Sequence, residues 1–209
     1  MNVIITCEHA GNQVPDCYKP IFSNLKDVLE SHRGYDPGAL EIAQFLATEC
    51  SAPLFVCETT RLLIEPNRSL NSHELYSTYS QQLFETDHEM ILNQYYYPHR
   101  NSVEELITKV SKPALHLSIH TFTPVLDGHT RAIDLGLLFD PSRKSEAWFC
   151  KELMDRLEHN FPDLTIKFNE PYKGTDDGFT TYLRTKFEDK EYLGIEIEVN
   201  QKYIGTEKW

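Results

Sequence analysis

The chain has 209 residues, a length that favours one globular domain, expected here over residues 1–209. Lysine and arginine total 20 against 32 aspartate and glutamate residues, and the resulting net charge of −12 disfavours non-specific binding to nucleic acid or to anionic membranes. Five scattered cysteines without CxxC spacing, no evident secretory leader and no long apolar run together predict a cytoplasmic protein.

The first half of the chain predicts strands that alternate with helices. An apolar, β-branched run at 3–7 is typical of a buried strand, and a second strand is expected at 54–57. Between them, apolar residues at helical spacing predict a helix over 39–50, with Asp36 placed to cap it. A polar segment at 77–94 is expected to be helical.

The second half repeats this alternation. The expected elements are strands at 114–119, 135–139, 164–168 and 194–200, with helices at 145–161 and from 178 onwards. Strands separated by helices favour an α/β fold with a mostly parallel sheet covered on both faces. Ligands of such sheets bind beyond the carboxyl ends of the strands.

Polar residues stand where several of these strands end. They are Glu8 and His9 after the first strand, His120 after the third, Glu196 and Glu198 on the last, and Asp36 before a helix. Two histidines and a carboxylate match a catalytic zinc site, which keeps a fourth position open for water. A further glutamate is the group that takes the proton of this water. The pattern therefore predicts metal-assisted hydrolysis.

Each of these residues also has a plainer interpretation. A histidine at a strand end is often a hydrogen-bonded structural residue, and Asp36 is well placed to cap a helix. Glu196 and Glu198 share one face of a strand, which is also the pattern of an edge strand with a solvated side. Spacing alone does not choose between the two glutamates.

Five motifs in order resemble the N-formylglutamate amidohydrolase (N-formylglutamate deformylase) family. They are CEHAGNQVP at 7–15, YDPGALEIA at 35–43, TRLLIEPNRS at 60–69, SIHTFTPVLDG at 118–128 and IEVNQ at 197–201. The resemblance implies a three-layer α/β sandwich with a mostly parallel mixed sheet. This phosphorylase/hydrolase-like architecture is similar to that of zinc carboxypeptidases and cell-wall amidases.

The resemblance also implies roles for individual residues. His9, Asp36 and His120 become the metal ligands, and Zn²⁺ the cofactor. Glu198 stands three positions before a glutamine and becomes the general base. Glu196 becomes a neighbour that orients or tunes it, although the last-strand glutamate of cell-wall amidases also matches Glu196.

An N-acyl glutamate has two carboxylates, which arginine binds bidentately. Arg68 and Arg131 lie in stretches that look like the family's and are the expected carboxylate ligands. Arg61 and Arg184 are further candidates, with surface salt bridges as the alternative. The segment 169–178 is expected to close over the substrate or to be a simple turn.

The expected function is zinc-dependent hydrolysis of an N-acyl amino acid. The resemblance implies N-formyl-L-glutamate, cleaved to formate and L-glutamate in histidine degradation. The alternatives are another N-acyl amino acid or a muramyl peptide as substrate, or a binding protein that has the same fold and no catalysis. A small molecule is the expected partner, without nucleic acid or membrane, and the oligomeric state stays open.

Overall fold

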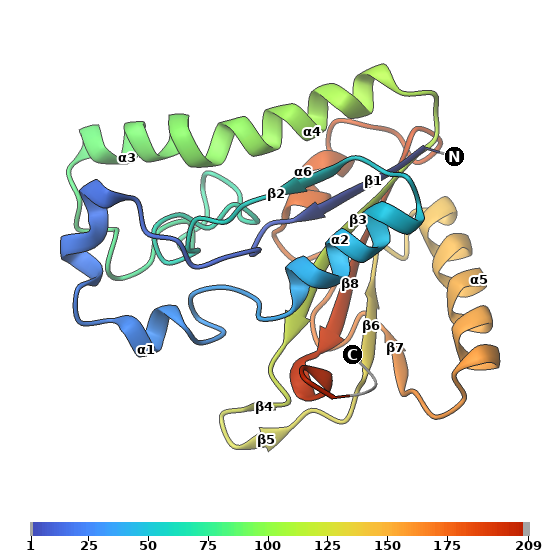
Figure 1. Cartoon of the computed structure of the whole chain (residues 1–209). Helices are drawn as coiled ribbons and strands as arrows, with labels where there is room; N and C mark the ends of the chain where they lie inside the picture. The colour runs from blue at the N-terminus through green and yellow to red at the C-terminus, as the bar shows by residue number, and fades with distance from the viewer. Residues whose placement is uncertain (1, 207–209) are drawn as a thin grey trace.

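A six-stranded sheet forms the centre of the computed structural model, which describes residues 2–206 (Figure 1). The strand order is β2-β1-β3-β8-β6-β7. The strands are β1 (Asn2–Cys7), β2 (Leu54–Val56), β3 (Ala114–Phe122), β6 (Leu135–Leu138), β7 (Ile166–Phe168) and β8 (Tyr192–Asn200). Neighbouring strands run parallel except for β6 and β8, which are antiparallel. A separate hairpin pairs β4 (Val125–Leu126) with β5 (His129–Thr130).

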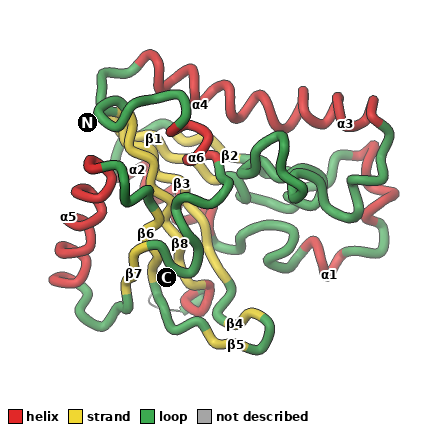
Figure 2. The backbone as a smooth tube through the Cα atoms, turned by 180° about the vertical axis from the view of Figure 1, so that it is seen from behind, coloured by secondary structure: helices red, strands yellow, loops and turns green. Residues whose placement is uncertain are grey.

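Helices cover both faces of this sheet. The α-helices are α1 (Lys26–Leu29), α2 (Ala39–Glu49), α3 (Glu85–Ile91), α4 (Tyr97–Lys109), α5 (Lys144–Asn160) and α6 (Phe179–Arg184). Short 3₁₀ helices are η1 (Asp16–Phe22) and η3 (Gln201–Tyr203). In Figure 1, α2 lies in front of the sheet, and the view from behind in Figure 2 brings α6 to the front. The three-layer α/β sandwich expected from the sequence is confirmed.

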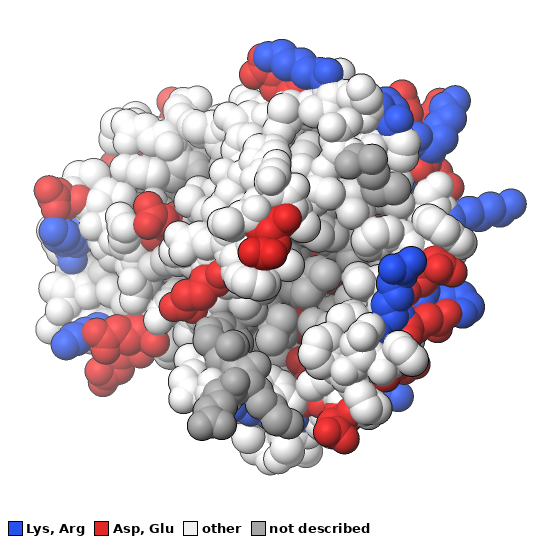
Figure 3. All heavy atoms as spheres, turned by 45° about the vertical axis from the view of Figure 1, so that its right-hand side comes forward, with Lys and Arg blue, Asp and Glu red and all other residues white. Residues whose placement is uncertain are grey.

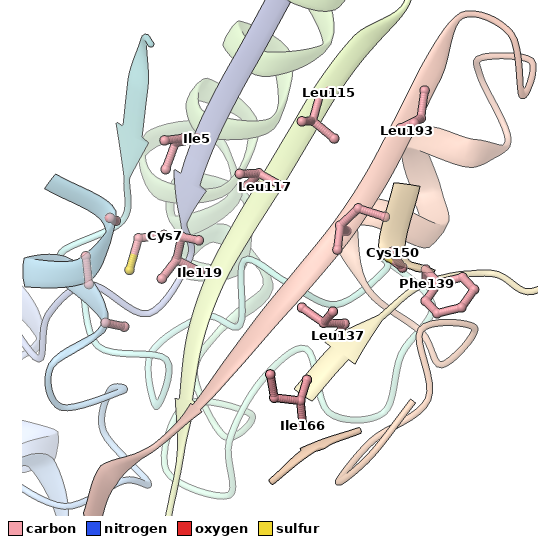
Figure 4. Packing of buried hydrophobic residues seen from close by; sticks show 14 residues of the cluster. Ile5, Cys7, Leu115, Leu117, Ile119, Leu137, Phe139, Cys150, Ile166 and Leu193 are labelled. Carbon is pink, nitrogen blue, oxygen red and sulfur yellow. The ribbon is translucent and has the colours of Figure 1, made fainter. Parts of the chain in front are cut away.

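One face of the sheet is apolar along its whole length. Alternate residues of neighbouring strands, including Ile5, Leu117 and Ile195, point into a core that α2 and α5 cover. Figure 4 shows the side chains of this core between the strands and the helices, with Cys7 and Cys150 among them. The core fixes the register of the central strands, because a slip of one residue would place apolar side chains on the opposite face.

The opposite face changes from apolar to polar toward the carboxyl ends of the strands. The side chains at alternate positions are Ile4 and Thr6 on β1 with Glu8 directly after it, Ala114, His116, Ser118 and His120 on β3, and Tyr192, Gly194, Glu196 and Glu198 on β8. At the apolar end they pack against α4 and α6. The polar end is buried as well, so each polar group there needs a partner.

A second apolar cluster lies beside the sheet. Leu62, Leu63 and Ile64 pack there against Ile91 and Tyr96. These contacts anchor the irregular segment 60–68 that follows β2. The segment carries several polar side chains of the candidate site.

The expected helix over 77–94 is only partly present. Residues 77–84 form turns, and α3 begins at Glu85. Ser77 donates a hydrogen bond to the carbonyl of Leu62, and its side-chain oxygen accepts one from the backbone N–H of Tyr79. Such local bonds of serine compete with helix formation. From Glu85 the helical run continues through the π-helical turn η2 (Leu92–Tyr96) into α4.

Asp36 does not cap a helix. Gly38 is the N-cap residue of α2, with a φ of 84°, and no side chain caps this helix end. The carboxylate of Asp36 points instead toward two histidines.

The surface carries both signs of charge. On the face drawn in Figure 3, acidic and basic side chains lie in small groups between larger uncharged areas. Among the helices of residues 2–206, none has the length and apolar character needed to cross a membrane.

Candidate metal centre

Three predicted ligands meet at the polar end of the sheet. His9 follows β1, Asp36 precedes α2, and His120 lies within β3. Nδ1 of His9 lies 3.1 Å from Oδ2 of Asp36 and 3.2 Å from Nδ1 of His120, and Nδ1 of His120 lies 3.0 Å from the same oxygen. All three residues are buried. The structure thus brings together donor atoms that lie 27 and 84 residues apart along the chain.

This triangle fits the geometry of a tetrahedral zinc site. Ligand atoms about 2.0 Å from zinc, at tetrahedral angles, are about 3.3 Å apart. The two Nδ1 atoms lie 3.2 Å apart and both lie near Oδ2 of Asp36, so a proton or a cation between these atoms would stabilise the arrangement. His9, Asp36 and His120 all border one cleft, so the fourth position of such a site is accessible to a small molecule.

The ring of His9 is held in place from its other side. Its Nε2 lies 2.5 Å from Oε1 of Glu65, a carboxylate that also accepts hydrogen bonds from Arg61 and from the backbone N–H of Asn67. Burial would raise the pKa of Glu65, but Arg61 and His9 outweigh it and lower the pKa. An ionised Glu65 requires a proton on Nε2 of His9, which leaves Nδ1 free to bind a metal.

The site attracts positive charge. Burial would raise the pKa of Asp36, yet His9, His120 and Arg61 hold it well below its ordinary value. Burial would also lower the pKa of His120, whereas its hydrogen bonds with Asp36 and Glu8 raise it well above the usual range. The arrangement that stabilises a proton here is suited to a divalent cation.

The two glutamates of β8 lie in different surroundings. Glu198 is paired in register with His120, and Glu196 with Ser118. Glu196 accepts a hydrogen bond of 2.5 Å from the hydroxyl of Thr180. By contrast, Oε2 of Glu198 is buried without any hydrogen-bond partner. Burial, together with Asp36 and Glu196, raises the pKa of Glu198 to about 8. β8 is a central strand, so the solvated edge considered for it is excluded.

Two of the four predicted arginines line the cleft. Arg61 reaches it, but its guanidinium is paired with Asp36 and Glu65. Arg68 also lines it, with Nε donating a hydrogen bond to the exposed Glu74 and Nη1 donating one to the carbonyl of Asp177. Segment 169–178 contributes another wall, through Tyr172, Lys173, Asp176 and Asp177.

The other two arginines lie elsewhere. Arg131 stands behind the wall of the cleft, where it donates a hydrogen bond to the hydroxyl of Tyr172 and packs between that ring and Phe122. Arg184 is buried away from the cleft. Its guanidinium binds Glu146 and the carbonyls of Gly174 and Gly194.

Sequence reasoning missed the groups that hold the two histidines. Glu65 lies within the motif at 60–69 and has no predicted role of its own, and its spacing of four residues from Arg61 is the one local signal of their ion pair. Ser118 received no role, although it lies two residues before His120 and therefore on the same face of β3. Glu8 was noted at the strand end without a function.

The family model of N-formylglutamate amidohydrolase matches residues 1–205. No curated protein matches this chain.

Two solved structures are similar over nearly the whole chain. Gene product Atu2144 from Agrobacterium tumefaciens has a TM-score of 0.84 and 28% identity, with 99% of this chain and 83% of that chain covered. An N-formylglutamate amidohydrolase from Ralstonia eutropha JMP134 has a TM-score of 0.56 and 15% identity, with 97% and 84% covered. At that identity the second likeness shows the fold alone.

Proposed function

Because this chain belongs to the N-formylglutamate amidohydrolase family, we propose that it is a zinc-dependent amidohydrolase acting on N-acyl amino acids. N-formyl-L-glutamate is the proposed substrate, with formate and L-glutamate as products, a reaction of histidine degradation. The observation that carries the proposal is the triangle of ligand atoms from His9, Asp36 and His120, with sides of 3.0–3.2 Å.

Zinc is the proposed ion because two imidazole nitrogens and one carboxylate oxygen are its typical ligands in hydrolases. When bound, zinc supplies a Lewis acid that polarises the scissile carbonyl and lowers the pKa of water.

Glu198 is the proposed general base. It stands beside His120 in the sheet and borders the cleft, and its Oε2 has no competing partner. Its raised pKa suits a group that takes a proton from water and then delivers it to the leaving nitrogen. Glu196 is held by Thr180 and is proposed to keep Glu198 in position.

Arg68 is the proposed ligand for a substrate carboxylate. It is the predicted arginine that lines the cleft with an exposed partner, Glu74, and exposed pairs of this kind contribute little. Arg131 is proposed to act through Tyr172, by holding that ring in the cleft wall.

Three variants test this assignment. His120→Ala should lose both bound zinc and release of formate from N-formyl-L-glutamate. Glu198→Gln should keep about one zinc per chain and lose turnover by at least a hundredfold, in line with the loss of a general base. Glu196→Gln is the matched control and should lose far less. A zinc-loaded wild type that cleaves no N-acyl amino acid would refute the proposal, and the reverse order of the two glutamate variants would exchange their roles.

A further inference from the structure

We propose that Glu8 and Ser118 are positioning residues that form a relay to His120, here called the Glu8–Ser118 relay. The relay fixes the protonated nitrogen and the ring orientation of His120, so that Nδ1 faces the metal position. This inference rests on the proposed metal centre and adds two residues to it.

The direction of the hydrogen bonds follows from the chemistry of the three groups. Oγ of Ser118 lies 2.7 Å from Oε2 of Glu8 and 2.9 Å from Nε2 of His120. A carboxylate only accepts, so the hydroxyl proton of Ser118 goes to Glu8. The oxygen of Ser118 then accepts the proton of Nε2. This order leaves Nδ1 of His120 with its lone pair, 3.0 Å from Oδ2 of Asp36.

The relay is fixed to the framework of the fold. Glu8 and Ser118 are both 0% exposed, so water does not replace either partner. Glu8 directly follows β1 and Ser118 lies in β3, the neighbouring parallel strand, whose pairing with β1 places Thr6 beside Ser118. The other carboxylate oxygen of Glu8 lies 3.3 Å from Nε2 of His99, which α4 supplies. Movement of the Glu8 carboxylate is therefore limited from two sides.

The two histidines of the site are thus held differently. Glu65 contacts His9 directly, whereas Glu8 acts on His120 chiefly through a hydroxyl, with its own Oε2 3.4 Å from Nε2. Removing the hydroxyl leaves both histidines and both carboxylates in the chain. The hydroxyl of Ser118 is consequently the part of the relay that a single small substitution isolates.

The test compares Ser118→Ala with Tyr192→Phe. Each removes one buried hydroxyl that bonds a buried histidine of β3, because the Tyr192 hydroxyl lies 2.7 Å from Nδ1 of His116. His116 is outside the ligand triangle, so Tyr192→Phe reports the general cost of such a loss. Glu8→Gln removes the charge of the relay at nearly constant size. Ser118→Thr changes the side chain but keeps the hydroxyl.

The measurement is the dissociation constant for zinc, obtained by competition with a chromophoric chelator, alongside thermal unfolding of each variant. Loss of a group that orients a metal ligand typically weakens metal binding by about 10- to 100-fold. We expect this weakening of zinc binding for Ser118→Ala and Glu8→Gln, and a weakening of less than about threefold for Tyr192→Phe. Ser118→Thr should bind zinc with an affinity close to that of the wild type. In the zinc-loaded protein, the Nε2 proton of His120 should exchange faster in Ser118→Ala than in the wild type.

The outcomes separate this inference from the proposed function. Zinc affinity that falls equally in Ser118→Ala and Tyr192→Phe, or that is unchanged in both relay variants, overturns the relay alone. A wild type that binds no zinc overturns the metal centre and the relay with it. If zinc affinity depends on Ser118 and Glu8 as expected, but the zinc-loaded wild type cleaves no N-acyl amino acid, only the proposed function is overturned.

Discussion

Single arginines in this chain have different tasks because their surroundings differ. Arg61 pairs with the carboxylates of Asp36 and Glu65, and Arg68 lies at the cleft with an exposed partner. Arg184 has only 6% of its side chain exposed and pairs with Glu146, which is fully buried. A guanidinium so enclosed stabilises the fold and leaves no donor for a substrate.

Substituting Arg184 and Arg68 separates these tasks. Arg184→Leu leaves Glu146 with Arg143 as its remaining cation, so we expect a loss of about 3 kcal/mol in the free energy of unfolding and an unchanged KM. Arg68→Leu should change stability by less than about 1 kcal/mol and raise KM about tenfold, through loss of a charged hydrogen bond. Urea unfolding and steady-state kinetics on N-formyl-L-glutamate measure both. If Arg184→Leu and Arg68→Leu raise KM equally, Arg184 does not act on stability alone and the two arginines do not have separate roles.

The sequence identifies the proposed metal ligands better than the residues that support them. His9 and His120 are identifiable because each stands at or near the end of an apolar strand, where a polar, titratable side chain is unusual. Glu65 and Ser118 are not, because their contacts join residues 56 and 110 positions apart, His9 with Glu65 and Glu8 with Ser118. Such contacts depend on which strands become neighbours.

Among the secondary-structure elements, β6 and segment 169–178 pack unusually closely. A Cβ added at Gly136 would lie 2.1 Å from the carbonyl oxygen of Glu170 and 3.2 Å from Cβ of Glu198. A Cβ added at Gly174 would lie 2.1 Å from the backbone nitrogen of Phe139. Because neither glycine has a Cβ, segment 169–178, which forms one wall of the cleft, packs in direct backbone contact with β6 and the residue that follows it.

Gly136→Ala should therefore displace segment 169–178. We expect a loss of about 1 to 3 kcal/mol in stability and a severalfold rise in KM, because Tyr172 and Lys173 move with the backbone. Gly128→Ala in the β4–β5 turn is the control. Its Cβ meets open space, and it carries only the strain of a φ of 79°, about 1 kcal/mol, with little change in KM. If both variants have the wild-type KM, this wall does not contact the substrate.

Elements with a clear apolar pattern were predicted well. The runs that became β1, β3 and β8 were identified to within about two or three residues, because their alternate faces are buried on both sides of the sheet. Residues 77–84 form turns where the sequence predicts a helix. The hydrogen bonds of Ser77 that hold these turns leave no trace in the spacing of apolar and polar residues. Asp36 matched a helix cap by position, and the attraction of two distant histidines decides its orientation.

In the whole molecule, the proposed metal ligands join parts of the chain that meet only in the folded state. The unfolded chain therefore has no comparable site, and we expect zinc binding to stabilise the fold. At free zinc about 100 times the dissociation constant, the gain is about 2.7 kcal/mol. For a chain of this size it raises the melting temperature by roughly 5 to 10 °C.

Calorimetry of the zinc-loaded and chelator-treated protein measures this rise. His120→Ala should melt at one temperature under both conditions. A wild type whose melting temperature is the same with and without zinc would show that no ion binds preferentially to the folded state.

The position of β8 affects how the protein is made. It is the last strand of the described chain, yet it lies between β3 and β6 in the middle of the sheet. During synthesis on the ribosome, the earlier strands therefore have a gap between them, with two unpaired edges, until β8 leaves the exit tunnel. Glu196 and Glu198 arrive with this strand, so we expect closure of the sheet and completion of the candidate site to occur together, once β8 has emerged. Chains released before β8 is made would expose two strand edges that are prone to aggregation. We therefore expect chaperones to bind the nascent protein at this stage.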